Sequence, residues 1–148
     1  MIYKMRYKTR YEMIYKLNEC IKKIKPNIVY MPFPGDVHGD HRKVFNIASS
    51  CTKIFRHPYI TDILLYETLS ETNFSIDPTK LSFRPNLYQD ISKYLKKKIL
   101  ICNIFKTEFK EHPFPRSTEA LTSLARLRGS EARLKYAEAF MIVKKIIS

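Results

Sequence analysis

Residues 28–41 read IVYMPFPGDVHGDH. The run starts with apolar, partly β-branched residues that suit a buried parallel strand, and Pro32 and Pro34 end that strand. The loop that follows packs two imidazoles and two carboxylates into six residues, and apolar residues then recur at helical spacing over residues 42–55. A strand that ends in a His/Asp-rich loop and then opens a helix is a usual place for a metal or catalytic site in an α/β protein.

The rest of the chain supports a layered α/β sheet in a single domain of 148 residues. Apolar periodicity predicts helices over residues 11–24, 91–105 and 118–128, the last with Ser117 as N-cap and Gly129 as terminator. Short apolar runs predict strands at 63–66 and 87–90. Residues 136–147 fit either a helix or a strand.

The composition narrows the class of protein. The chain carries 27 Lys and Arg against 14 Asp and Glu, a net charge of +13. These charges are spread out, with one short run at residues 96–98, so no nucleic-acid partner is expected. Three widely spaced cysteines form neither a disulfide framework nor a Cys-x-x-Cys pair, which favours a cytoplasmic protein. No apolar run approaches the roughly 20 residues of a transmembrane helix.

The His/Asp loop allows two interpretations. His38 and His41 can supply imidazole nitrogens to zinc, and Asp36 and Asp40 can ligate the metal or orient the histidines. The alternative is a solvated polar loop in which Asp40 caps the following helix. His57 falls in a His-Pro pair that predicts a solvated turn, and no role is expected for it.

The loop also looks like the first metal motif of the calcineurin-like metallophosphoesterases, but the glycine content excludes that class. Their later motifs contain Gly-Asp, Gly-Asn and Gly-His pairs. The chain has three glycines, and no such pair follows Gly39.

A second resemblance covers residues 26–142. The chain is similar, in order and spacing, to the zinc-dependent GlcNAc-phosphatidylinositol de-N-acetylases, the PIG-L/LmbE-like deacetylases. The motifs that carry the resemblance are Pro26-Asn27-Ile28-Val29-Tyr30, Asp36-x-His38-x-Asp40-His41-Arg42, Tyr66-Glu67-Thr68, Phe83-Arg84-Pro85-Asn86, Asp90-Ile91-Ser92, Lys97-Lys98, His112-Pro113-Phe114-Pro115-Arg116-Ser117, Leu124-Ala125-Arg126-Leu127-Arg128-Gly129 and Ala137-Glu138-Ala139-Phe140.

The resemblance implies specific roles. His41 is expected to be a zinc ligand, and His38 to polarise the amide carbonyl and protonate the leaving amine. Asp40 is expected to orient His38, and Asp36 to act beside this pair. His112 and Arg116 are expected in a loop that either faces the substrate or is only structural. The implied reaction is removal of an acetyl group from an N-acetylglucosamine-type sugar or glycoconjugate, with zinc lowering the pKa of a bound water to about 7.

The chain departs from the family at one point. The family's first motif, Ala-His-Pro-Asp-Asp-Glu, supplies two zinc ligands and the general base, and it is absent here. We therefore expect a C-terminal portion of such a deacetylase: a partial Rossmann-like (LmbE-like) three-layer sheet that lacks the N-terminal strands. The zinc site should be incomplete and the chain inactive alone, with a missing N-terminal half or a second copy as partner. The strand at residues 28–31 should then lie at or near a sheet edge. The alternative function is a non-catalytic remnant or a basic module that binds anionic ligands.

Overall fold

The computed structural model describes residues 9–77, 79 and 81–147. Its elements follow the order α1 (Arg10–Ile24), β1 (Ile28–Pro32), α2 (Gly39–Cys51), β2 (Asp62–Tyr66), β3 (Leu87–Asp90), α3 (Leu95–Cys102), α4 (Thr118–Glu131) and β4 (Ala137–Lys145). None of these helices is long and apolar enough to cross a bilayer. The expected α/β class is confirmed.

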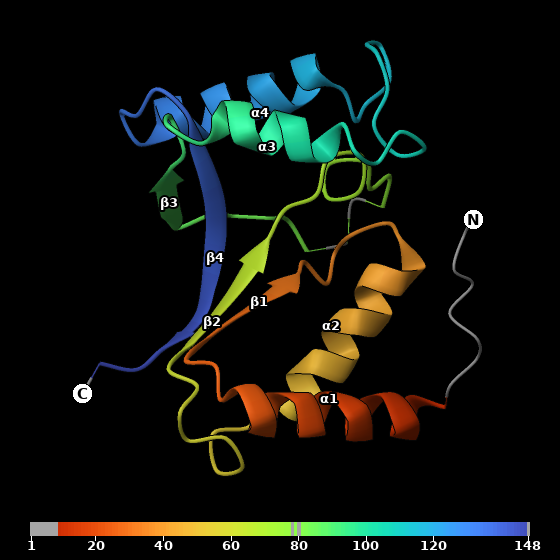
Figure 1. The fold of residues 1–148 in the computed structure, drawn as a ribbon, viewed down its shortest axis with the longest axis vertical. Helices are drawn as coiled ribbons and strands as arrows, with labels where there is room; N and C mark the ends of the chain where they lie inside the picture. Colours follow the sequence, from red (N-terminus) through yellow and green to blue (C-terminus); the bar gives the residue numbers. More distant parts are fainter. Residues whose placement is uncertain (1–8, 78, 80, 148) are drawn as a thin grey trace.

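The four strands form one sheet in the order β1-β2-β4-β3. β1 and β2 are parallel, whereas β4 runs antiparallel to both β2 and β3. Helices α1 and α2 lie on one side of the sheet, and α3 and α4 lie on the other (Figure 1). The expected three-layer arrangement is therefore present, and in the described part of the chain β1 is an edge strand, as predicted.

Each sheet face has its own apolar core. On the α1/α2 side, Ile63 and Leu65 of β2 pack with Met31, Cys51 and other buried side chains. On the other side, a second cluster joins Leu95 of α3 to Leu121 and Ala125 of α4. Successive β2 residues point to opposite faces of the sheet. Two such cores are what a sheet covered on both faces requires.

Several predicted helix boundaries are wrong. Helices α2 and α3 end earlier than expected, at Cys51 and Cys102 instead of residues 55 and 105. Three other boundaries differ for a local reason. α2 begins at Gly39 because the His38 side chain, not Asp40, caps it: Nδ1 accepts a hydrogen bond from the Asp40 amide at 3.3 Å. α3 begins only at Leu95, after a turn in which Asp90 Oδ1 accepts a hydrogen bond from the Ser92 amide at 2.8 Å. α4 is capped by Ser117 as predicted, but it runs through Gly129 to Glu131.

Gly129 is inside α4 for a packing reason. A Cβ at this position would lie 2.6 Å from the Leu134 carbonyl oxygen, so only glycine lets the returning chain approach this closely. That return leads directly into β4, which settles the open choice for the C-terminal segment in favour of a strand.

The prediction of a solvated turn at His57 is also wrong. His57 is 1% exposed. Its Nε2 lies 3.0 Å from Asn18 Oδ1 and its Nδ1 lies 2.7 Å from the Tyr59 hydroxyl. The imidazole therefore joins the segment after α2 to helix α1, a structural role.

Candidate functional site

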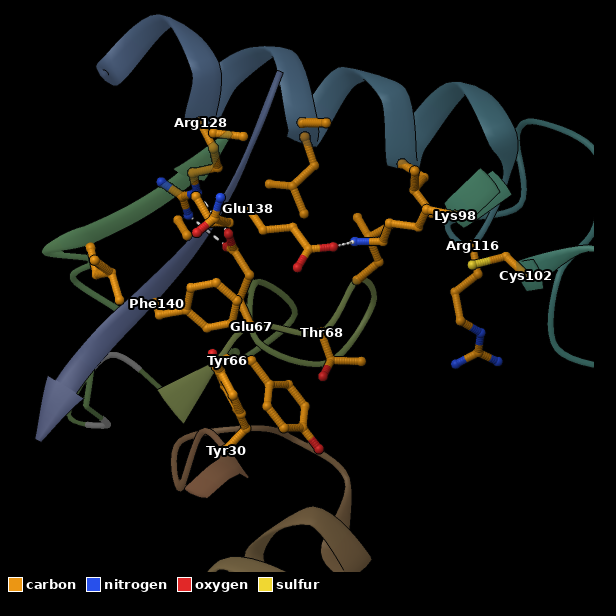
Figure 2. A pocket seen from close by; sticks show the side chains of 18 of the residues that line it. Tyr30, Tyr66, Glu67, Thr68, Lys98, Cys102, Arg116, Arg128, Glu138 and Phe140 are labelled. Carbon is orange, nitrogen blue, oxygen red and sulfur yellow. Dashed lines mark hydrogen bonds and ion pairs between the residues drawn. The ribbon is translucent and has the colours of Figure 1, made fainter. Parts of the chain in front are cut away.

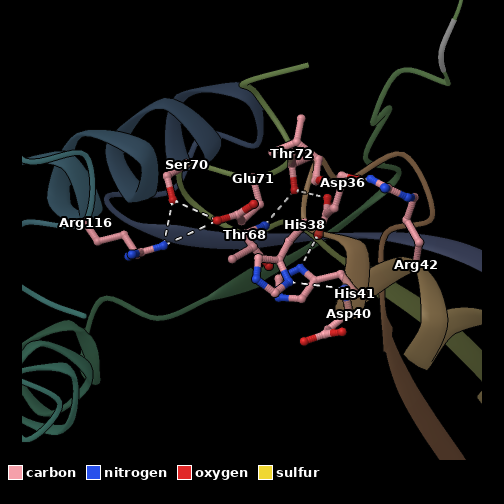
Figure 3. A network of polar contacts seen from close by, with 11 residues as sticks. Asp36, His38, Asp40, His41, Arg42, Thr68, Ser70, Glu71, Thr72 and Arg116 are labelled. Atoms are coloured by element: carbon pink, nitrogen blue, oxygen red, sulfur yellow. Dashed lines mark hydrogen bonds and ion pairs between the residues drawn. The ribbon is translucent and has the colours of Figure 1, made fainter. Parts of the chain in front are cut away.

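The His/Asp residues lie where β1 and β2 end. These strands are parallel neighbours, so the loops at their carboxyl ends emerge on the same edge of the sheet. The Val37 amide donates to the Glu71 carbonyl at 3.1 Å and joins the two loops. Figure 3 shows the resulting polar network, in which side chains from residues 36–42 meet those from residues 68–72.

Asp36 is the centre of this network. It is fully buried, and its two carboxylate oxygens have different partners. Oδ2 lies 2.7 Å from His41 Nδ1, and Oδ1 accepts a hydrogen bond from the Thr72 hydroxyl at 2.6 Å. The Thr72 oxygen in turn accepts a hydrogen bond from the Thr68 amide at 2.8 Å. Every oxygen of the buried carboxylate is thus satisfied, which burial of a charge requires.

The contact with Asp36 determines which nitrogen His41 presents. An ionised carboxylate only accepts hydrogen bonds, so His41 Nδ1 carries the proton toward Asp36. The neutral imidazole then has its lone pair on Nε2, which has no hydrogen-bond partner among the described residues. A carboxylate behind an imidazole, with the far nitrogen free, is the arrangement that orients histidine ligands of zinc.

His38 presents the opposite chemistry. Its Nδ1 accepts the Asp40 amide proton, so the proton of the neutral ring is on Nε2. The His38 and His41 ring centroids are 5.1 Å apart. The two rings are thus neighbours, and in these tautomers Nε2 is a donor on His38 and an acceptor on His41.

The carboxylate of Asp40 does not contact His38. It lies 3.3 Å from Lys43 Nζ, in an exposed pair, while the backbone amide of Asp40 contacts His38. The structure therefore does not place the Asp40 carboxylate against His38, where the sequence-based assignment expected it. In this structure Asp36 contacts a histidine, and that histidine is His41.

Arg42 stabilises the backbone of the loop between β1 and α2. Its Nη1 donates to the carbonyl oxygens of Asp36 and Val37, at 2.8 and 2.7 Å. Gly35 lies on the other side of Asp36, and a Cβ there would come within 2.3 Å of the Phe33 ring. Arg42 thus fixes the backbone at Asp36, and the close packing of Phe33 requires glycine at position 35.

Arg116 reaches the second loop, whereas the His112 side chain is exposed. Arg116 Nη1 lies 3.0 Å from Ser70 Oγ and 3.3 Å from Glu71 Oε1, and Nη2 lies 3.1 Å from Glu108 Oε2. Ser70 has a positive φ of 68°, which a non-glycine residue adopts only when its surroundings hold it there. Arg116 therefore anchors the loop that carries Thr72.

A cavity of about 630 Å³ lies between the sheet and helices α3 and α4. Tyr30, Tyr66 and Phe140 lie on its sheet side, opposite α4 (Figure 2). Neither His38 nor His41 lines it, but Thr68 does, and Thr68 also belongs to the network. Burial raises the pKa of Tyr66, and the negative charge of Asp36 raises it further. The cavity is mainly apolar and shares Thr68 with the polar network around Asp36.

Two ion pairs cross the cavity wall. Arg128 binds Glu67 through two contacts, Nε to Oε1 at 2.7 Å and Nη2 to Oε2 at 2.6 Å. The hydrogen bond to Glu67 is the main cause that raises the pKa of Arg128. Lys98 of α3 pairs with Glu138 of β4. These pairs join the α3/α4 layer to the sheet.

The described residues fit one ligand of a zinc site and not a whole site. A catalytic zinc usually has three protein ligands. No group of three His, Cys, Asp or Glu side chains arranged to hold a metal ion occurs in the part of the chain that the structure describes. His41, with Asp36 behind it, is the residue in this loop whose geometry suits a ligand.

Sequence reasoning missed the second loop. No role in the site was predicted for residues 70–85, yet Thr72 and Glu71 complete the environment of Asp36. The available signal was topological: this segment follows the strand that pairs with β1, so its first residues had to emerge beside the His/Asp loop.

No family model matches the chain. Solved structures do share its fold. N,N'-diacetylchitobiose deacetylase from Pyrococcus horikoshii matches 92% of the chain with a TM-score of 0.67 and 19% identity. GalB, the 4-carboxy-2-hydroxymuconate hydratase from Pseudomonas putida KT2440, matches 99% with a TM-score of 0.71 and 17% identity. The A40926 pseudoaglycone deacetylase Dbv21 matches 96% with a TM-score of 0.56 and 14% identity.

The matches cover 92–99% of this chain but only part of each neighbour. The chain spans 52%, 63% and 61% of the lengths of these three structures. Identities this low establish a shared architecture and no shared activity. The chain therefore shares its α/β fold with these proteins over 52–63% of their lengths.

Proposed function

We propose that this chain is the C-terminal portion of an LmbE-like N-deacetylase, with an N-acetylglucosamine-type sugar or glycoconjugate as substrate. The observation that carries the proposal is the Asp36–His41 contact of 2.7 Å, with His38 beside it at the carboxyl ends of two parallel strands. The motifs shared with the PIG-L/LmbE-like deacetylases support it, as does a fold shared with two deacetylases.

The reaction adds water to an amide. The water oxygen bonds to the acetamide carbon, the C–N bond breaks, and the leaving nitrogen takes a proton, so that acetate and a free amine result. His38 is suited to the carbonyl oxygen and the leaving nitrogen because its Nε2 is a donor on the exposed side of the loop. Asp36 keeps the free nitrogen of His41 directed to the same side.

We assign His41 as the zinc ligand that this chain contributes. Because the described residues do not complete a metal site, the remaining ligands and the base would come from another segment. The free edge of β1 is where such a segment would add a strand, since its backbone groups have no partner there among the described residues. Ile28 and Tyr30, both exposed on this strand, would then be covered.

The fold alone does not select this reaction. One neighbour is a hydratase, an enzyme that also adds water to an electrophilic carbon. Deacetylation is favoured over hydration by the sequence motifs, which resemble the deacetylases over residues 26–142. A cytoplasmic location belongs to the same proposal, in keeping with three cysteines that are all unpaired.

Two measurements on purified protein test the proposal. Zinc affinity, measured by competition with a chromophoric chelator, should be weak for this chain and should fall further in His41→Ala but not in His112→Ala. Release of free amine from N-acetylglucosamine derivatives should be undetectable for the chain alone. It should emerge when the chain is co-expressed with a segment encoded upstream of Met1 that contains His-Pro-Asp-Asp.

Each part of the proposal has its own contrary result. Chelator-sensitive turnover by the 148-residue chain alone would show that no second segment is needed. Equal zinc affinity in wild type and His41→Ala would remove His41 from the metal site. Hydration of an unsaturated acid by the reconstituted protein, without amine release, would favour the hydratase chemistry.

A further inference from the structure

Helix α3 and the turn after it form an exposed ridge that is both apolar and basic. Leu100 is 69% exposed, Ile101 49%, Ile104 72% and Phe105 60%. The backbone bonds from the Ile104 amide to Ile101 and from the Phe105 amide to Cys102 continue the helical path past the end of α3. A contiguous group of large exposed apolar side chains marks an interaction surface more often than single exposed residues do.

Helical spacing places lysines in the same ridge. Lys96 lies four residues before Leu100, and Lys97 four residues before Ile101, so each lysine neighbours an apolar side chain on the helix surface. Both lysines are exposed. The opposite face of α3 is occupied, because Leu95 belongs to the buried cluster with α4. The mixed face is therefore directed away from the fold.

The charge of this segment is of one sign. Residues 93–106 contain five lysines and no aspartate, glutamate or arginine. Lys98 pairs with Glu138 on the inner side of α3, so the ridge has four exposed lysines: Lys93, Lys96, Lys97 and Lys106. We propose that this ridge, residues 93–106, docks on an anionic lipid surface, with the lysines at the headgroups and the aliphatic and aromatic side chains in the acyl boundary. Amphipathic surfaces with lysine beside leucine, isoleucine and phenylalanine bind membranes in this way.

Other occupants fit the ridge less well. A second copy in a symmetric contact would bring two lysine-rich ridges together, and like charges across an interface oppose association. A nucleic acid would favour arginine and stacking side chains over exposed leucine and isoleucine. An anionic bilayer satisfies both the charge and the aliphatic side chains. The inference does not depend on the proposed reaction.

The ridge lies at the end of the molecule away from α1 (Figure 1). The segment 52–61, between α2 and β2, lies at the α1 end (Figure 1). That segment contains a matched control, because Phe55 is 77% exposed and its ring contacts two cations, Lys53 and Arg56. A general preference of lipid for exposed aromatic and basic groups would involve both ends equally.

Vesicle co-sedimentation of the full chain tests the inference. We expect binding to vesicles of phosphatidylcholine with phosphatidylserine, little binding to phosphatidylcholine alone, and weakening by salt. Because each lysine near an anionic surface is worth on the order of fivefold, Lys96→Gln/Lys97→Gln should weaken binding by about 25-fold. Ile104→Ser/Phe105→Ser should weaken it by at least about tenfold.

Controls separate this surface from overall charge. Phe55→Ser, and Lys16→Gln/Lys23→Gln on the exposed face of α1, should bind as the wild type does. Circular dichroism of each variant confirms the fold. No binding to the anionic vesicles, equal binding to the neutral ones, or equal losses in the control and ridge variants would each overturn the assignment.

Discussion

Replacing Asp36 by asparagine should damage both the stability of the site loop and its metal affinity. The side chain is fully buried and its two oxygens accept short hydrogen bonds from Thr72 and His41. Asparagine keeps the shape and one acceptor, but its amide group replaces the other oxygen with a donor. The carboxamide oxygen can still face His41, and the Thr72 hydroxyl then has no acceptor at this position.

The magnitude follows from these contacts. A hydrogen bond to an ionised group contributes about 1.5–3 kcal/mol, and one of the two is lost. Removing the charge also removes its desolvation cost, so we expect a loss of about 1.5–2 kcal/mol in the free energy of unfolding. If His41 ligates zinc, loss of the carboxylate that orients it should weaken zinc binding by roughly 10–100-fold.

Asp40→Asn is the matched control. The Asp40 side chain is exposed and pairs only with Lys43 among the described residues, so its replacement should change unfolding by less than about 0.5 kcal/mol. Urea unfolding and chelator competition on both variants make the comparison. An Asp36→Asn protein as stable as the wild type, or a larger zinc defect in Asp40→Asn, would refute the assignment of Asp36 as the orienting carboxylate.

Four further predictions concern the stability of the fold. Gly35→Ala should destabilise by about 1–3 kcal/mol in thermal or urea unfolding, because its Cβ would lie 2.3 Å from a buried ring. Gly39→Ala should be neutral or stabilising by up to about 1 kcal/mol, because a Cβ there, at the start of α2, would lie 4.0 Å from its nearest neighbour, Arg42 Nη2. Arg128→Met should cost about 2–4 kcal/mol because it leaves the half-buried Glu67 carboxylate unpaired, and Glu67→Gln/Arg128→Met should recover at least half of that loss in a double-mutant cycle. The hydrogen bond from the Thr61 hydroxyl lowers the pKa of Asp62, and the positive charge of Lys145 lowers it further. The pKa of Asp62 in the folded protein thus lies below the unfolded value of about 3.9. The stability that Asp62 contributes is therefore present above about pH 3.9 and is lost as the pH falls through the folded pKa. In Asp62→Asn, the free energy of unfolding should fall less steeply with decreasing pH in this acid range than it does in the wild type.

The β1 loop and helix α1 were predictable because their signals are local. Strand β1, the loop from Gly35 to His41 and the helix after it are adjacent in the sequence, and each has its own periodicity or turn residues. The predicted helix starts were wrong by a few residues where a capping side chain or a turn set the boundary. The His38 side chain started α2 early, and the turn at Asp90 delayed α3, since capping geometry is not visible in apolar spacing.

The sequence by itself determined that this is an α/β chain with one chemically dense loop, and which residues that loop contains. Only the tertiary structure decided which carboxylate contacts which imidazole. Thr72 is 36 residues from Asp36, and β4 enters the sheet between β2 and β3 from the end of the chain. Those pairings depend on how distant segments return to the same sheet edge, and a pattern with a period of two or 3.6 residues carries no information about contacts at that separation.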